Sequence, residues 1–66
     1  MNEEESVLGL LYKEFDTEQQ QLTVALSQGQ PKDFAEYRFL CGKLHSFAVA
    51  KAIINDTVER MRKQSE

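Results

Sequence analysis

The 66-residue chain holds little of what usually stabilises a very small domain. Cys41 is its only cysteine and His45 its only histidine, so an intrachain disulfide is excluded and no Cys/His cluster can bind a metal. Below about 80 residues a single hydrophobic core rarely supplies more than ~3–5 kcal/mol of stability. We therefore expect no metal or other cofactor, and we expect self-association or docking on a larger partner to complete the fold.

The sequence also lacks a long hydrophobic run. The apolar run at 7–12 is far too short for a membrane span, which takes about 20 apolar residues. The first residues, Met1-Asn2-Glu3-Glu4-Glu5, are acidic where a signal peptide would be basic. A single thiol is also compatible with a reducing compartment. These features predict a soluble intracellular protein that does not enter a membrane.

Basic residues are scarce in the first part of the chain. Residues 1–28 contain six acidic side chains and Lys13 alone, whereas residues 29–66 contain seven basic and five acidic side chains. The overall charge of −3 argues against a nucleic-acid partner, because phosphate binding needs clustered Lys and Arg. The opposite charges of the two parts suit two segments that fold back on each other.

The only proline lies in a segment that divides the chain, SQGQPKD at 27–33. Gly29 can adopt the left-handed conformation that ends a helix, and Asp33 with Glu36 has the spacing of a capping box. We predict one all-α domain over 1–66, an antiparallel two-helix hairpin with helices at about 4–28 and 33–63 and a turn at 28–32. Pro31 could alternatively occupy the first turn of the second helix.

The first predicted helix has one apolar stripe with a period near seven. The stripe contains Leu8, Leu11, Phe15, Leu22 and Ala25. Glu18 and Gln19 interrupt it, so the middle of the helix has few core side chains. Asp16 and Thr17 could cap a second, separate helix there, but the lack of a local Gly or Pro favours one continuous helix.

The second predicted helix is apolar on two sides. The stripe expected to face the first helix contains Tyr37, Leu40, Leu44, Phe47, Ile54, Val58 and Met61. A second arc contains Phe39, Gly42, Ser46, Val49, Ala50 and Ile53. A helix with this pattern is expected to be covered from more than one direction.

Small residues recur every four positions in the second arc, at Gly42, Ser46 and Ala50. A glycine inside a helix costs about 1 kcal/mol relative to alanine, and a close helix crossing would offset that cost. The alternative is that Gly42 is simply tolerated. The second helix is also the longer one, and we expect its overhang to leave Val58 and Met61 beyond the first helix. The predicted protein interface is therefore Phe39, Gly42, Ser46, Val49, Ala50, Ile53, Val58 and Met61.

Catalytic arrangements are not found in this sequence. Cys41 has only His45 as a nearby base, and it is interpreted as a packing residue. Lys51 lies in the inward stripe, where its long stem can reach an acid of the first helix such as Glu5. The basic residues near the end, Arg60, Arg62 and Lys63, complement the helix dipole, with a phosphate contact as the alternative. We predict no enzymatic activity.

The second half of the chain resembles small helical proteins encoded in the structural gene modules of tailed bacteriophages. The resemblance covers about thirty residues, with Asp33-Phe34-Ala35-Glu36-Tyr37, Leu40, Gly42, Ser46-Phe47, Ala50 or Ala52, Ile53-Ile54 and Asp56 as its matching positions. It implies a structural or assembly protein of the virion, near the head or the head-to-tail region. Its partners would be itself or a larger phage structural protein, in the host cytoplasm or the particle. Two alternatives are a regulator that binds a host protein and a hairpin dimer that binds structured RNA.

Overall fold

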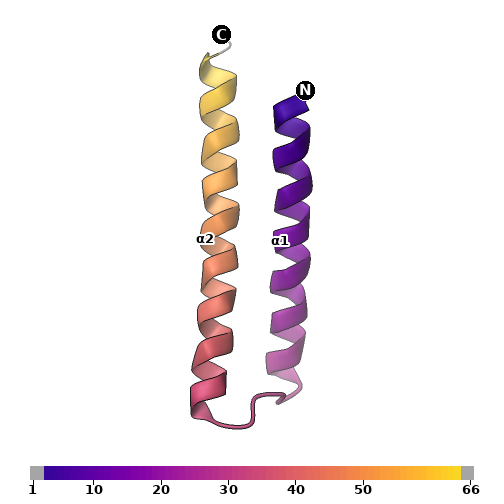
Figure 1. Cartoon of the computed structure of the whole chain (residues 1–66), viewed down its shortest axis with the longest axis vertical. Helices are drawn as coiled ribbons and strands as arrows, with labels where there is room; N and C mark the ends of the chain where they lie inside the picture. Colours follow the sequence, from indigo (N-terminus) through magenta and orange to yellow (C-terminus); the bar gives the residue numbers. More distant parts are fainter. Residues whose placement is uncertain (1–2, 65–66) are drawn as a thin grey trace.

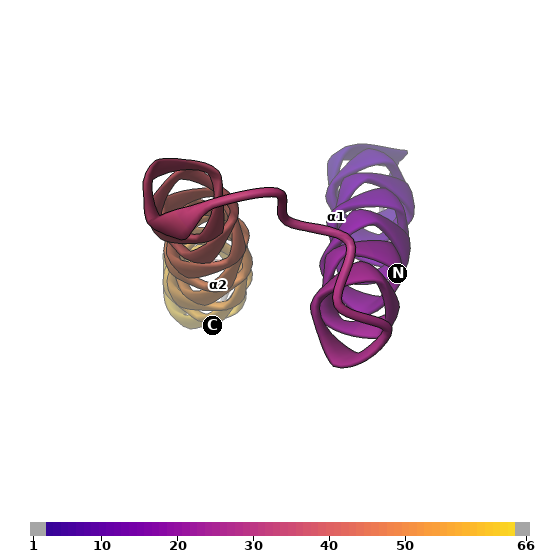
Figure 2. The ribbon, with the colours of Figure 1, turned by 90° about the horizontal axis from the view of Figure 1, so that it is seen from below.

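The computed structural model describes residues 3–64, so positions 1, 2, 65 and 66 of the predicted domain lie outside the described residues. Two helices, α1 (Glu3–Ser27) and α2 (Phe34–Gln64), run antiparallel beside each other (Figures 1 and 2). The described part of the chain contains no strand. The predicted all-α hairpin is confirmed, and the helices, with 25 and 31 residues, hold more than two thirds of the chain. Each helix end lies one residue from its predicted position.

Local chemistry explains where the helices end. Gly29 has a φ of 72°, and the amides of Gly29 and Gln30 donate to the carbonyls of Leu26 and Ala25 at 3.1 Å each. This is a Schellman motif, which satisfies the last carbonyls of α1. Asp33 Oδ1 accepts a 2.8 Å hydrogen bond from the Glu36 amide, so Asp33 caps the start of α2. Pro31 lies between these signals, outside both helices.

The α1 helix is continuous through its polar middle. Asp16 does not start a new helix there, because its carboxylate accepts a hydrogen bond from Gln20 at 2.8 Å and another from Lys51. Three glutamates in the first turn, Glu3, Glu4 and Glu5, complement the positive end of the helix dipole.

The contact between the helices forms a thin core. Ile54, with 8% of its surface exposed, is the only buried side chain among residues 3–64. Phe15 and Phe47 meet at a ring-centroid distance of 5.8 Å. Most of the other predicted inward residues are half-buried, whereas Tyr37 and Leu11 are exposed. The molecule measures 50 × 15 × 12 Å, which is one layer of two helices.

Two ion pairs define the register of the helices. Lys51 contacts Asp16 and Arg62 contacts Glu5, each at 2.7 Å. Our prediction that Val58 and Met61 project beyond the first helix was wrong. Both are half-buried, and Val58 lines a groove together with residues of α1. The reason is that α2 also extends past α1 at the turn (Figure 1), so less of its extra length remains at its C-terminal end.

Candidate interaction surface

The predicted interface residues separate into two groups in the structure. Phe39 and Ile53 are 65% and 57% exposed, and Gly42, Ser46 and Val49 are exposed as well. Ala50 is half-buried at the edge of this group. By contrast, Val58 and Met61 are half-buried, and Val58 contributes to the contact with α1. The second apolar arc of α2 is therefore available to another molecule.

Gly42 has open space around it within this chain. A Cβ placed on Gly42 would meet no atom within 4 Å, so α1 makes no close crossing there. Ser46 Oγ donates a 3.0 Å hydrogen bond to the Gly42 carbonyl, so this hydroxyl is bonded within its own helix. Any close approach to this ridge must come from a partner.

The two broad sides of the hairpin differ in polarity. On one side of the hairpin, a groove is lined by residues that come one position after an inward-facing residue in the sequence. These are Gly9 and Lys13 of α1, and Asn55 and Glu59 of α2. Glu5 and Arg62 close the same groove through their ion pair. We call this the polar side.

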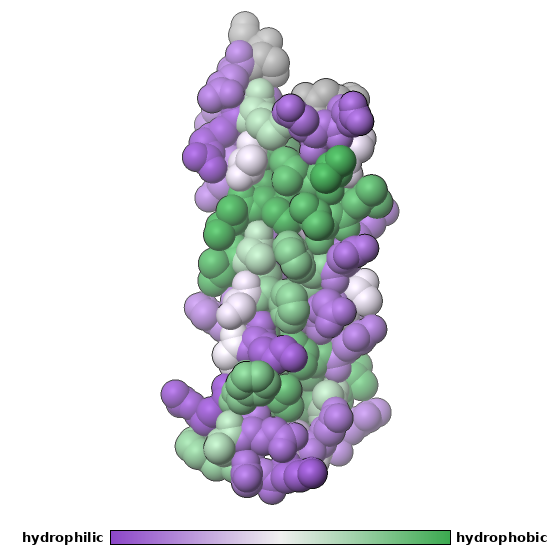
Figure 3. Space-filling view, viewed as in Figure 1, coloured by the Kyte–Doolittle hydropathy of each residue, from purple (hydrophilic) through white to green (hydrophobic). Residues whose placement is uncertain are grey.

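The opposite side of the hairpin carries the residues that come one position before the inward-facing residues in the sequence of each helix. Because each helical residue is turned by 100° from the last, Val7, Leu11 and Ile53 lie across the layer from the polar side. All three are exposed. Figure 3 shows hydrophobic surface across both helices in the half with the free ends, and more polar surface towards the turn. We call this the apolar side.

Sequence reasoning missed the contribution of α1 to the apolar side. It placed Leu11 in the contact with the second helix and gave Val7 no role. The available signal was the spacing of four between Val7 and Leu11, which puts them on one ridge. A helical wheel drawn for one helix does not show which of its two flanks forms a common surface with a flank of the neighbouring helix.

Lys51 fills the gap in the apolar stripe of α1. Its Nζ donates to Asp16 Oδ1 at 2.7 Å and to Gln19 Oε1 at 2.8 Å, and it lies 5.2 Å from the Tyr12 ring centroid. The predicted ion pair with an acid of the first helix is confirmed, but the acid is Asp16 and not Glu5, which pairs with Arg62. The hydrogen bond with Asp16 raises the pKa of Lys51, while burial acts in the opposite direction.

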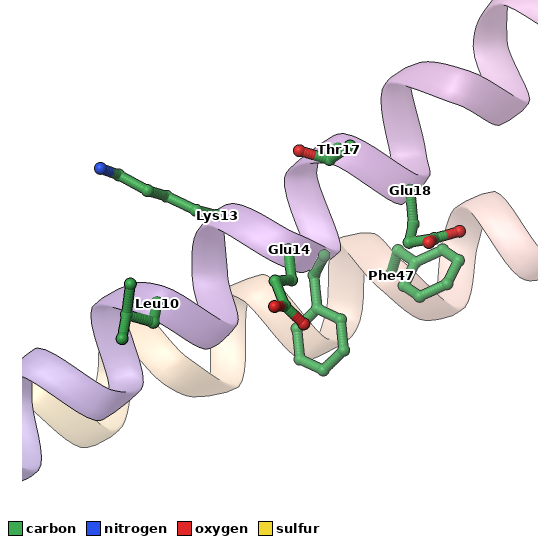
Figure 4. A pocket seen from close by; sticks show the side chains of 7 residues that line it. Leu10, Lys13, Glu14, Thr17, Glu18 and Phe47 are labelled. Atoms are coloured by element: carbon green, nitrogen blue, oxygen red, sulfur yellow. The ribbon is translucent and has the colours of Figure 1, made fainter.

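Phe47 borders a shallow hollow on the α1 side of the molecule. Glu18 reaches from α1 towards Phe47 and Glu14 also lines the hollow, whereas Lys13 points away from it (Figure 4). Neither glutamate makes an ion pair among residues 3–64. These carboxylates remain available to a cation of another chain.

Cys41 contacts an aromatic residue of its own helix. A hydrogen bond with the Cys41 thiol raises the pKa of the Tyr37 phenol. His45 is exposed. Within residues 3–64, no three His, Cys, Asp or Glu side chains are grouped in a way that could hold a metal ion.

Neither described helix combines the length and apolar character needed to span a membrane. The chain matches no protein-family model, and no curated protein or solved structure is similar enough to count as a match. The candidate site therefore has to be interpreted from its own surface.

Proposed function

We propose that this chain is a non-enzymatic assembly protein that acts through helix–helix contacts. The proposal rests on the exposed apolar side of the hairpin. The hairpin has only one buried side chain among residues 3–64. Exposed apolar surface of this kind marks protein interaction sites in soluble proteins. The proposed contact surface includes the exposed arc of α2, from Phe39 to Ile53.

The resemblance of residues 33–56 to tailed-phage proteins supports a more specific proposal. The chain would act in building the phage particle, near the head or the head-to-tail region. Its larger partner would then be a capsid or portal subunit, met in the host cytoplasm and retained in the virion. A helical hairpin suits this role because an exposed helix face, such as the arc of α2 from Phe39 to Ile53, can pack on helices of a larger protein.

Copurification tests this proposal. We expect the tagged chain, expressed during infection by the phage that encodes it, to retain capsid or portal subunits, and mass spectrometry of purified particles to detect it. Ile53→Gln should reduce this retention, because Ile53 is 57% exposed on the proposed surface. Leu10→Gln is the matched control, since Leu10 is 64% exposed but lies outside the proposed surface. Exclusive retention of a host enzyme would contradict the phage assignment and select the regulator alternative.

The RNA-binding alternative has little support from the charges near the end of α2. Arg60 and Lys63 line the same hollow as Asp56 and Glu59, so acidic and basic side chains are mixed there. A phosphate backbone requires a surface where the basic side chains are not balanced by acids. Salt-dependent retention of structured RNA would contradict this reasoning.

A further inference from the structure

We propose that a second copy of this chain covers the apolar side, with the two hairpins pointing in the same direction. In this dimer α1 of each copy lies over α2 of the other, and all free helix ends lie at one end of a four-helix bundle. The inference rests on the proposed function, because it names the partner for the same surface.

The exposed area supports a partner of this size. The chain exposes 5266 Å² of surface at a mass of 7.6 kDa. A compact monomer of that mass is expected to expose about 4300 Å². The excess of roughly 1000 Å² is comparable to the ~800 Å² that each partner buries in a standard protein interface. One further two-helix layer is sufficient to cover it.

A seven-residue spacing on both helices indicates that the covering element is helical. On α1 the residues Leu11, Glu18 and Ala25 stand seven apart, and on α2 the residues Lys43, Ala50 and Thr57 do the same. These six residues lie beside the contact between α1 and α2. They form a second line of contact positions, which we call the second seam, as in a helical bundle. Alanine and threonine in this seam allow two layers to approach closely.

Charge complementarity selects a second copy and its orientation. The described α1 has six acidic side chains and one lysine, a net charge of −5, whereas α2 has three acidic and six basic side chains, a net charge of +3. Placing α1 over α2 of the partner brings opposite charges together, whereas α1 over α1 would repel. Within the second seam, Glu18 of one copy can approach Lys43 of the other. Lys43 makes no ion pair among residues 3–64 and lies 5.6 Å from the Phe39 ring centroid.

The position of the hydrophobic surface selects the same orientation. A two-fold axis parallel to the helices places the apolar half of one hairpin on the apolar half of the other. A two-fold axis perpendicular to the helices would instead place the free ends of one hairpin on the more polar turn region of the other (Figure 3). It would also place α1 of one copy on α1 of the other. Charge and hydrophobicity therefore favour the parallel axis.

Spin-label distances test the orientation in the full-length chain. Cys41→Ala removes the native thiol, and Gln64→Cys or Gln30→Cys then places one label per chain at the free end or at the turn. We expect the label-to-label distance to be well below the 50 Å length of the hairpin for both positions. A distance near 50 Å at either position, or no dipolar coupling at all, would overturn the inference.

A matched pair of valines tests the surface. Val7 and Val24 are both 52% exposed on α1, but Val24 lies on a different side of the helix. We expect Val7→Gln to raise the dissociation constant of the dimer about tenfold, because two apolar contacts are lost per dimer. Val24→Gln should leave it unchanged, as measured by sedimentation equilibrium. Equal effects of the two variants would overturn the proposed surface.

The dimer and the proposed function fail in different experiments. A chain that remains monomeric and still retains capsid or portal subunits would overturn the second copy as partner but support the assembly function. A dimer with the expected label distances that retains no phage protein would support the inference and contradict the phage assignment.

Discussion

Lys51 occupies a place in the helix contact where most bundles have an apolar side chain. Its side chain is 18% exposed, and Asp16, Gln19 and the Tyr12 ring surround its ammonium group. An ammonium group in such a place must be paired, because an unpaired partly buried charge is strongly destabilising. Its partners are specific to one register, so the polar contact also helps to align the two helices.

Alkaline pH should weaken this contact. The pKa of Lys51 is raised above the ordinary value of 10.5 by its hydrogen bond with Asp16. The stabilisation is therefore complete below pH 10.5 and is lost as the pH rises through the raised pKa of the folded state. We expect the wild-type chain to lose more stability than Lys51→Met when urea unfolding is compared at neutral and strongly alkaline pH.

The control for this comparison is Lys13→Met, which removes an exposed lysine of the polar side that has no ion pair among residues 3–64. This variant should keep the wild-type loss of stability at alkaline pH. An identical pH dependence for all three proteins would show that the Lys51 contact does not contribute to the stability of the folded state.

Glycine has opposite roles at two positions of this chain. Gly42 lies inside α2 with open space around its Cα, so we expect Gly42→Ala to stabilise the chain by about 0.5–1 kcal/mol through helix propensity. Gly29 has a φ of 72°, so Gly29→Ala should destabilise it by about 1 kcal/mol. Both values come from denaturant unfolding followed by circular dichroism. A loss of stability for Gly42→Ala would indicate that a partner helix packs closely on that ridge.

At the scale of the helices, capping determines where α2 begins. Asp33 Oδ1 accepts the Glu36 amide, so we expect Asp33→Ala to reduce the free energy of unfolding by about 1 kcal/mol. Asp33→Asn retains a capping oxygen and should have a much smaller effect. Urea unfolding of the two variants provides the measurement. Equal losses in both would show that the charge of Asp33, and not its cap, stabilises the helix start.

The helix ends could be predicted because they depend on neighbours in the sequence. Gly29, Pro31 and Asp33 restrict the backbone locally, and no distant contact is needed to interpret them. The residues that pair with Lys51, and the α1 residues that cover Val58, depend instead on how the two helices are aligned along their length. Because the apolar repeat is near seven residues, sliding one helix along the other by a turn again brings apolar residues opposite each other. The spacing alone therefore does not tell whether Lys51 reaches Asp16 or Glu5.

The candidate surface was predictable only on α2. Its second arc stands out on a helical wheel because Phe39, Val49 and Ile53 have no place in the inward stripe. On α1, Val7 and Leu11 border the inward stripe and become a separate surface only when the orientation of both helices is known. The division into a polar and an apolar side is therefore a property of the pair.

The whole molecule is one layer of helices, so its two broad sides face solvent in the single chain. Buried apolar area drives folding at roughly 25 cal/mol per Å², and a single layer buries little of it. Chains below about 40 to 70 residues usually need a further support. The second layer in the proposed dimer provides that support and leaves the polar side exposed to water.

The turn has a further consequence for domain exchange. If 28–33 became helical, α1 and α2 would merge into one rod, and two chains could pair by exchanging their second halves. Pro31 prevents this, because its ring would clash with the Ser27 carbonyl in a continuous helix and it has no amide hydrogen to donate. Gly29, already in a left-handed conformation, bends the chain at the same place. Exchange of second halves through one continuous helix is therefore disfavoured by the turn itself.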